Sequence, residues 1–298
     1  MDDLREKLTA IMKDLPAGDL HKVQNDTYAD ELGRLFRVQS HQQIEAKREL
    51  SERLKQLGKD RRHFVFTDME AVREIIDHFS NKHLGYLFTL LCYMEFKTGR
   101  LVNAKGESLT IQEIREALGV RDNRTVNKFI RSMTDRGVIE ERADGYYINR
   151  KYHFRDEAFN ERVIKTFMSA LKKASEMVSK ADLGILYRLL PYVHYSTNMI
   201  CINPFEQDAE KIEYLNAGAV AELVGIHERK ARAALDRLRK AGIIAETTLR
   251  DRKREVFYTL NPYIFYRKPG KPDESLRAMF AATPYAGAKG RIVRRRKK

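Results

Sequence analysis

The chain contains only two cysteines, Cys92 and Cys201, among its 298 residues. Two are too few for the disulfide framework of a secreted protein, and neither has a Cys or His at metal-ligand spacing. Both lie among apolar residues, so we expect buried thiols and no metal site. No stretch approaches the roughly 20 apolar residues of a membrane span, and the first residues lack the apolar core of a signal peptide. We therefore expect a cytoplasmic protein.

Catalytic signatures are also missing from the sequence. There is no Gly-rich phosphate loop, no nucleophile elbow and no H-E-x-x-H motif. The eight histidines are scattered, and the acidic residues show no paired arrangement typical of a nuclease. His194 stands in an apolar stretch and is expected to be a hydrogen-bonded core residue. The sequence thus predicts no enzyme and no cofactor.

Positive charge is in excess, since 56 Lys and Arg face 42 Asp and Glu, a net charge of +14. Such an excess points to an acidic partner, most commonly nucleic acid. Much of it lies in residues 268–298, a basic tail that we expect to be disordered and to add salt-dependent, non-specific affinity for DNA.

Residues 1–62 carry apolar side chains at helical spacing and are expected to form an N-terminal helical region. Two interpretations remain open, a packing or solvated helix and a dimerisation arm that makes a homodimer. The apolar side chains form three stripes: Leu4, Leu8, Ile11 and Leu15; Tyr28, Leu32, Leu35 and Phe36; and Leu50, Leu54 and Leu57.

Further along the chain, Thr67 and Glu70 have the spacing of a capping box, which predicts a helix running to about Phe79.

The sequence also repeats itself. Residues 80–91 resemble residues 179–190, the segment after Gly137 resembles that after Gly242, and the segments ending in Phe154-Arg155 and Tyr266-Arg267 correspond. Several matches in one order indicate two copies of one structural unit, residues 80–155 and 179–267.

Each copy has the pattern of a helix, a short helix, a Gly turn, a third helix and a β-hairpin. The first helices are expected over 82–97 and 181–195, the turns at Gly119 and Gly225, and a capping box at Thr110 and Glu113. Asp122 can cap the third helix of copy one. Its expected buried face is Val126, Phe129, Ile130 and Met133, and that of copy two is Ala231, Ala234, Leu235 and Leu238.

The predicted fold is therefore mainly α with small β-hairpins, of the α+β class, with two tandem winged helix-turn-helix modules. The expected domains are 1–62, the N-terminal helical region; 63–158 and 159–267, the two winged-helix modules; and 268–298, the tail.

In a winged-helix module the third helix enters the major groove, where Asn pairs with adenine and Arg or Lys with guanine. Glu228 has two interpretations, an acceptor from cytosine or a local cap or ion pair. A basic wing suits phosphate or minor-groove contact. The predicted DNA-binding residues are Asn123, Arg124, Asn127, Lys128 and Arg131 in copy one, Glu228, Arg229, Lys230 and Arg232 in copy two, and Arg250, Arg252, Lys253 and Arg254 in the second wing.

These repeats, with Ile148-Asn149 in copy one and the segment Leu260-Asn261-Pro262 through Arg267 in copy two, resemble two groups of winged-helix proteins. These are the RepL-type replication initiators of small Firmicute plasmids and the MarR-like regulators carried by Firmicute phages. Copy one departs from them with Arg150 in place of the proline, and the duplication departs from their single module. The resemblance implies binding of double-stranded DNA.

Three functions remain as hypotheses. The first is a phage or plasmid transcription regulator, favoured because winged helices most often serve that role. The second is a replication initiator that binds an origin. The third is a protein-interaction platform without DNA binding, against which the basic third helix and wing of copy two speak.

Overall fold

The computed structural model describes residues 18–24, 27–37, 45, 62–156, 162–249 and 255–286. The chain divides into two compact units, residues 1–59 and 60–298. Its helices and small antiparallel sheets make a mixed fold that agrees with the expected α+β class.

The described part of the first unit is a three-stranded antiparallel sheet of β1 (His21–Gln24), β2 (Thr27–Ala29) and β3 (Leu35–Arg37). The prediction of a helical region is wrong for these residues. The cause is a tight turn: the Asp30 carboxylate accepts from the backbone N–H groups of Leu32 and Arg34, and Gly33 has a φ of +74°. Such a turn reverses the chain and converts the expected stripe into a hairpin. The other two stripes, and thus the expected dimerisation arm, lie largely outside the described residues.

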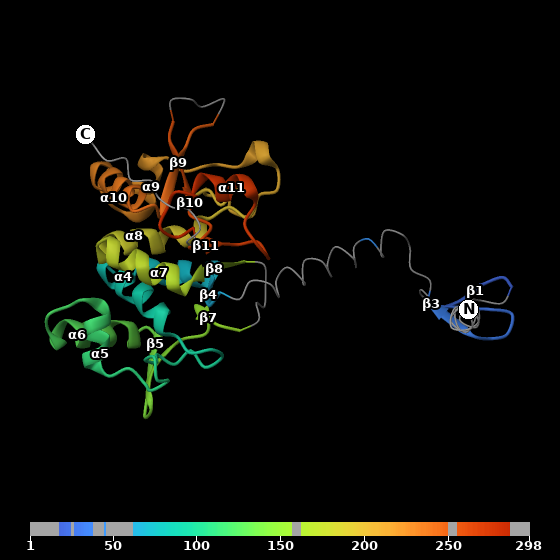
Figure 1. The fold of residues 1–298 in the computed structure, drawn as a ribbon, viewed down its shortest axis with the longest axis horizontal. Coiled ribbons are helices and arrows are strands. Elements are labelled where there is room, and N and C mark those ends of the chain that lie inside the picture. Colours follow the sequence, from blue (N-terminus) through green and yellow to red (C-terminus); the bar gives the residue numbers. More distant parts are fainter. Residues whose placement is uncertain are drawn as a thin grey trace, which may run out of the picture. The chain divides into compact units, whose positions relative to one another are not determined.

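The second unit contains two repeats whose helices and strands follow the same order, with one additional 3-10 turn, η3, in repeat two (Figure 1). Both begin earlier than the sequence match suggested, with a strand and a helix. Repeat one comprises β4 (Phe64–Asp68), α3 (Met69–Ile76), α4 (Asn81–Leu90), the 3-10 turn η1 (Leu91–Tyr93), α5 (Ile111–Leu118), α6 (Asn123–Thr134), β5 (Ile139–Arg142), β6 (Gly145–Ile148) and β7 (His153–Phe154). Repeat two comprises β8 (Val163–Phe167), α7 (Met168–Met177), α8 (Lys180–Leu189), η2 (Leu190–Tyr192), η3 (Ala209–Lys211), α9 (Ala217–Val224), α10 (Glu228–Lys240), β9 (Ile244–Thr247), β10 (Phe257–Leu260) and β11 (Phe265–Tyr266). The short helix α11 (Glu274–Met279) follows. The expectation of a disordered tail over residues 268–298 is therefore wrong for its described part, because Leu276, Phe280 and Tyr285 are buried against the fold.

Several predicted helix limits need correction. Thr67 is the fourth residue of β4, and Asp68 caps α3 by accepting from the N–H groups of Glu70 and Ala71. The helix ends at Ile76, short of Phe79. The helices expected over 82–97 and 181–195 are also shorter, because each closes in a 3-10 turn, after which Met94 and Val193 make isolated β-bridges.

A four-stranded antiparallel sheet in the order β11-β8-β4-β7 joins the repeats. The central pair comes from different repeats, with Phe66 opposite Lys165, and each central strand pairs on its outer edge with the last strand of its own repeat. The sheet is therefore symmetric, and one hydrophobic core runs through both repeats.

The second junction between the repeats is the packing of α4 on α8. A methyl group on Gly85 would overlap the backbone carbonyl oxygen of Lys180, and one on Gly184 would overlap that of Asn81. These are corresponding contacts of the two repeats. Two glycines thus let the helix backbones approach closely, and the close approach fixes how the repeats are oriented.

Candidate nucleic-acid interface

The path of the chain into α6 is set by local hydrogen bonds. Thr110 and Glu113 form the predicted capping box of α5. Gly119 ends that helix with a φ of +66°, a conformation that glycine adopts at little cost. Asp122 then caps α6 by accepting from the Thr125 N–H at 2.7 Å. These three predictions are confirmed.

One face of α6 is buried and the other is exposed. Val126, Phe129, Ile130 and Met133 lie in the core, as predicted. The opposite face exposes the five predicted contact residues of copy one, Asn123, Arg124, Asn127, Lys128 and Arg131. Within the described residues none of these three basic side chains has an ion-pair partner, so their charges are available to a ligand.

Repeat two builds α10 in the same way. Gly225 has a φ of +70°, and His227, which the sequence did not suggest as a cap, accepts the Arg229 N–H at its Nδ1. The predicted buried face is confirmed, and Glu228, Arg229, Lys230 and Arg232 are exposed. The Glu228 carboxylate accepts from Arg232 Nε at 2.8 Å and Nη2 at 2.5 Å, which is the local role considered for it.

The two caps align the helices residue by residue, so that Arg124 and Arg229 are each the second residue of their helix. Both are exposed, and neither has an ion-pair partner within the described part of the chain. At the fifth position the repeats differ, with Asn127 in one and the paired Arg232 in the other. The two exposed faces thus share one arginine and are otherwise chemically different.

The hairpins that follow these helices also differ. Between β5 and β6, Arg142 pairs with Glu140 at 2.7 Å and Tyr147 donates to Asp144 at 2.6 Å. The charges of Arg142 and Asp144 at the tip of this first hairpin are therefore already engaged within the hairpin. The hairpin of β9 and β10 is antiparallel, with Thr247 opposite Phe257. Its predicted contact residues, Arg250, Arg252, Lys253 and Arg254, lie outside the described residues.

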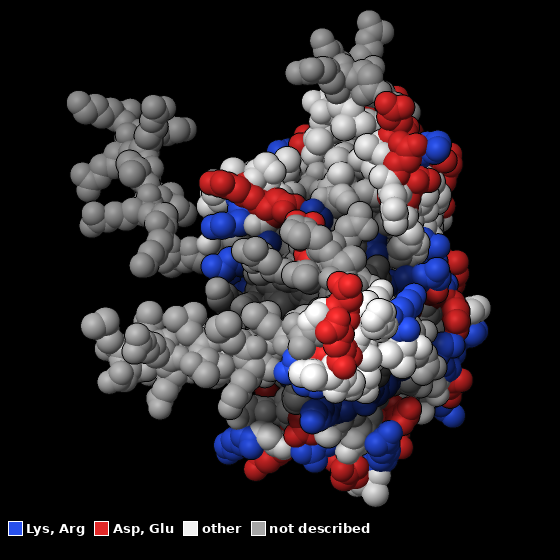
Figure 2. Space-filling view, turned by 90° about the vertical axis from the view of Figure 1, so that its right-hand side faces the viewer, with Lys and Arg blue, Asp and Glu red and all other residues white. Residues whose placement is uncertain are grey.

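The helices α6 and α10 lie on the same side of the second unit. In Figure 1, α6 and α10 lie at the left, at the lower and upper ends, with α4, α7 and α8 between them. The face turned to the right in Figure 1 is drawn in Figure 2, where basic and acidic side chains are interspersed. A ligand that met both helices would therefore lie along one side of the unit.

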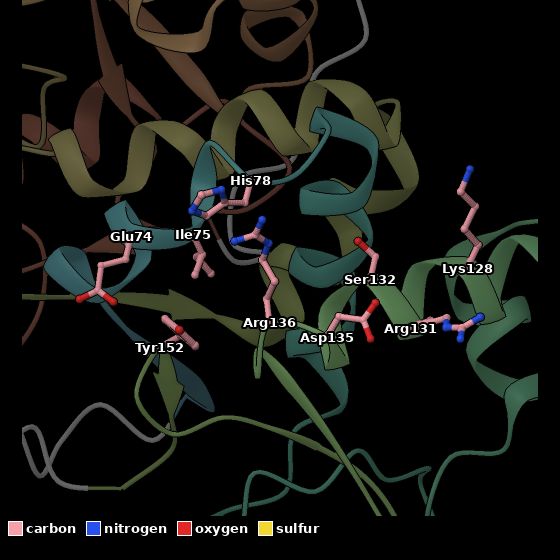
Figure 3. A pocket seen from close by; sticks show the side chains of 9 residues that line it. All are labelled: Glu74, Ile75, His78, Lys128, Arg131, Ser132, Asp135, Arg136 and Tyr152. Atoms are coloured by element: carbon pink, nitrogen blue, oxygen red, sulfur yellow. The ribbon is translucent and has the colours of Figure 1, made fainter.

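A hollow lies beside α6, between that helix and α3 (Figure 3). Its floor contains Ile75 and Tyr152, which are 4% and 6% exposed. His78 and Arg136 extend into it from the two sides, and Arg131 stands at its edge. The hollow adjoins the exposed face of α6, and its chemistry is mixed, with an apolar floor and charged walls.

The two cysteines and His194 lie away from this interface and pack within the fold. Burial raises the pKa of Cys92 and of Cys201 to about 12. Cys201 is fully buried, whereas Cys92 keeps part of its surface exposed to solvent. His194 is in the core as predicted, between Thr197 and the Glu206 carbonyl oxygen. In the described ranges no group of three His, Cys, Asp or Glu residues is placed to hold a metal ion. None of the helices described there is long and apolar enough to cross a membrane.

Comparisons with protein-family models, with curated proteins and with solved structures found no match for this chain.

Proposed function

We propose that the chain binds double-stranded DNA through its two repeats, each acting as a winged-helix module. The helices α6 and α10 would enter the major groove, and the hairpins β5–β6 and β9–β10 would contact the backbone or the minor groove. The observation that carries the proposal is the pair Arg124 and Arg229. They occupy the same position on two helices that lie on one side of the unit, and both are exposed.

The junction of the repeats supports the use of both helices on one site. Because the central sheet and the contact of α4 with α8 join the repeats through backbone atoms, a single chain holds α6 and α10 in a set orientation. Successive major grooves on one face of DNA lie about 34 Å apart. Arg124 and Arg229 would contact similar bases in the two halves of the DNA site. Asn127 and Arg232, which occupy the fifth position of α6 and of α10, would contact different bases. We therefore propose a long site with two unlike halves.

The expected use is control of transcription by a phage or plasmid protein. Recognition of a replication origin employs the same contacts, and the position of the bound sequence separates the two: a site at a promoter supports regulation, and a site beside replication genes supports initiation.

The test compares Arg124→Ala, Arg229→Ala and the double variant in binding to a DNA fragment selected by the intact chain. A lost bidentate contact to guanine should cost about 1–3 kcal/mol and relax the preference at one base position. Lys271→Ala serves as the matched control, because Lys271 is exposed and lies outside both helices. Unchanged affinity and unchanged base preference in the double variant would refute the proposed orientation of α6 and α10.

A further inference from the structure

The groove between α7 and α10 in repeat two is filled by residues 283–285, here called the C-terminal plug. Asn261 Nδ2 donates to Thr283 Oγ1 at 3.1 Å, and Lys173 Nζ donates to the Pro284 carbonyl oxygen at 2.9 Å. The Tyr285 hydroxyl contacts Met177 Sδ at 3.3 Å. Tyr285 is buried and joins the core. A segment of turns that follows α11 therefore completes repeat two.

The corresponding groove of repeat one is the hollow of Figure 3. The correspondence is anchored by two asparagines, since Asn149 Nδ2 donates to the Gly137 carbonyl oxygen at 2.8 Å and Asn261 Nδ2 to that of Gly242 at 2.7 Å. A Cβ on Gly242 would meet Thr283 Cγ2 at 2.9 Å, whereas one on Gly137 would meet nothing within 4 Å. The seat that the plug occupies in repeat two is thus open in repeat one.

The side chains around the open seat differ from those around the filled one. Glu74 and His78 stand where repeat two has Lys173 and Met177, and Arg136 stands where it has Ala241. Glu74 is neutralised by Lys151 at 2.5 Å.

Positive charge dominates what is left of the lining. The basic side chains Lys128, Arg131 and Arg136 have no ion-pair partner among the described residues, and Asp135 is the remaining acid. The floor of Ile75 and Tyr152 stays apolar. This surface fits an acidic segment with an aromatic anchor, and the basic tail of the chain itself has the wrong charge for it.

We propose that the groove between α3 and α6 is a docking site for an acidic segment of a partner protein. The segment lies on repeat one as the C-terminal plug lies on repeat two, with an aromatic ring on Ile75 and Tyr152 and carboxylates near Arg136. A DNA backbone would meet the cations but would leave the apolar floor unused, so a peptide is the better match. The groove shares Lys128 and Arg131 with the predicted DNA-contacting face of α6, whereas Arg136, Ile75 and Tyr152 are not among the predicted DNA contacts.

The test uses the full chain and a fluorescent peptide, Asp-Glu-Thr-Pro-Tyr-Asp-Glu, with binding followed by fluorescence anisotropy. Arg136→Glu should weaken binding by about tenfold or more, which corresponds to about 1.4 kcal/mol. Ser132→Tyr, which fills the hollow without changing its charge, should do the same, and so should Tyr to Ala in the peptide. Lys271→Glu is the charge-matched control and should leave binding unchanged.

Absence of saturable binding, or an equal loss in Lys271→Glu, would overturn the proposal. So would the finding that Arg136→Glu weakens binding of a short DNA duplex but not of the peptide, because the groove would then be a phosphate-contacting surface. DNA binding by the intact chain is measured in parallel, so failure of the peptide site is distinguishable from failure of the proposed function.

Discussion

Replacement of Gly85 by alanine probes the junction of the two repeats. The added methyl group would lie closer than 3.0 Å to the backbone carbonyl oxygen of Lys180. A backbone atom cannot swing aside as the end of a flexible side chain can, so α4 and α8 must separate. The symmetric change, Gly184→Ala, places a methyl group on the carbonyl oxygen of Asn81 and should behave in the same way.

Two opposing terms set the size of the effect. Alanine in place of glycine favours a helix by about 1 kcal/mol. Overpacking of a core typically costs about 1–3 kcal/mol and can cost more, and a clash between backbones stands at the upper end of that range. We expect Gly85→Ala to lower the free energy of unfolding by about 2 kcal/mol, measured by urea denaturation of the full chain.

A matched control comes from α9. A Cβ on Gly218 would have its nearest neighbour, Asn216 Oδ1, at 3.4 Å. Gly218→Ala should therefore leave stability unchanged or raise it by up to about 1 kcal/mol. If Gly85→Ala were as stable as the unaltered chain, or followed the control, the inferred packing of α4 on α8 would be wrong.

Three further predictions concern buried polar groups. Burial lowers the pKa of His153 to about 3, so the unfolded chain binds a proton below its pKa of 6.5 while the folded chain does not. The contribution of His153 to stability should therefore fall by about 1.4 kcal/mol per pH unit below that value, and a pH series of denaturation curves on His153→Phe should show a flatter slope. Because burial raises the pKa of Cys92 and Cys201 to about 12, neither thiol should react with a thiol reagent in the native protein at about pH 8, and rapid labelling would contradict this. Arg237→Ala leaves the buried carboxylate of Asp182 without its bidentate partner at 2.7 and 2.9 Å, and it should cost about 1–3 kcal/mol of unfolding free energy in thermal or chemical denaturation.

The local parts of each repeat could be predicted because short-range patterns decide them. The buried faces of α6 and α10 follow from helical spacing, and the turns at Gly119 and Gly225 follow from glycine's access to positive φ. The exposed residues of the candidate interface then follow as the opposite face.

The parts that joined distant segments could not be predicted. Phe64-Val65-Phe66 and Val163-Ile164-Lys165 pair in the central sheet, but their similarity lies in strand propensity and not in matching residues. The periodicity around Tyr28 suggested a helix, and the Asx turn at Asp30 decided for strands instead. The packing of the C-terminal plug on repeat two could not be predicted either, because it depends on contacts between segments that are far apart in the sequence.

DNA binding by both repeats can be tested by selecting bound fragments from a random DNA pool with the full chain at about 150 mM salt, where non-specific phosphate contacts are weakened. We expect one long enriched motif with two unlike halves, each containing the same base, contacted by Arg124 in one half and by Arg229 in the other. No enrichment, or binding that vanishes uniformly as salt is raised, would contradict this expectation.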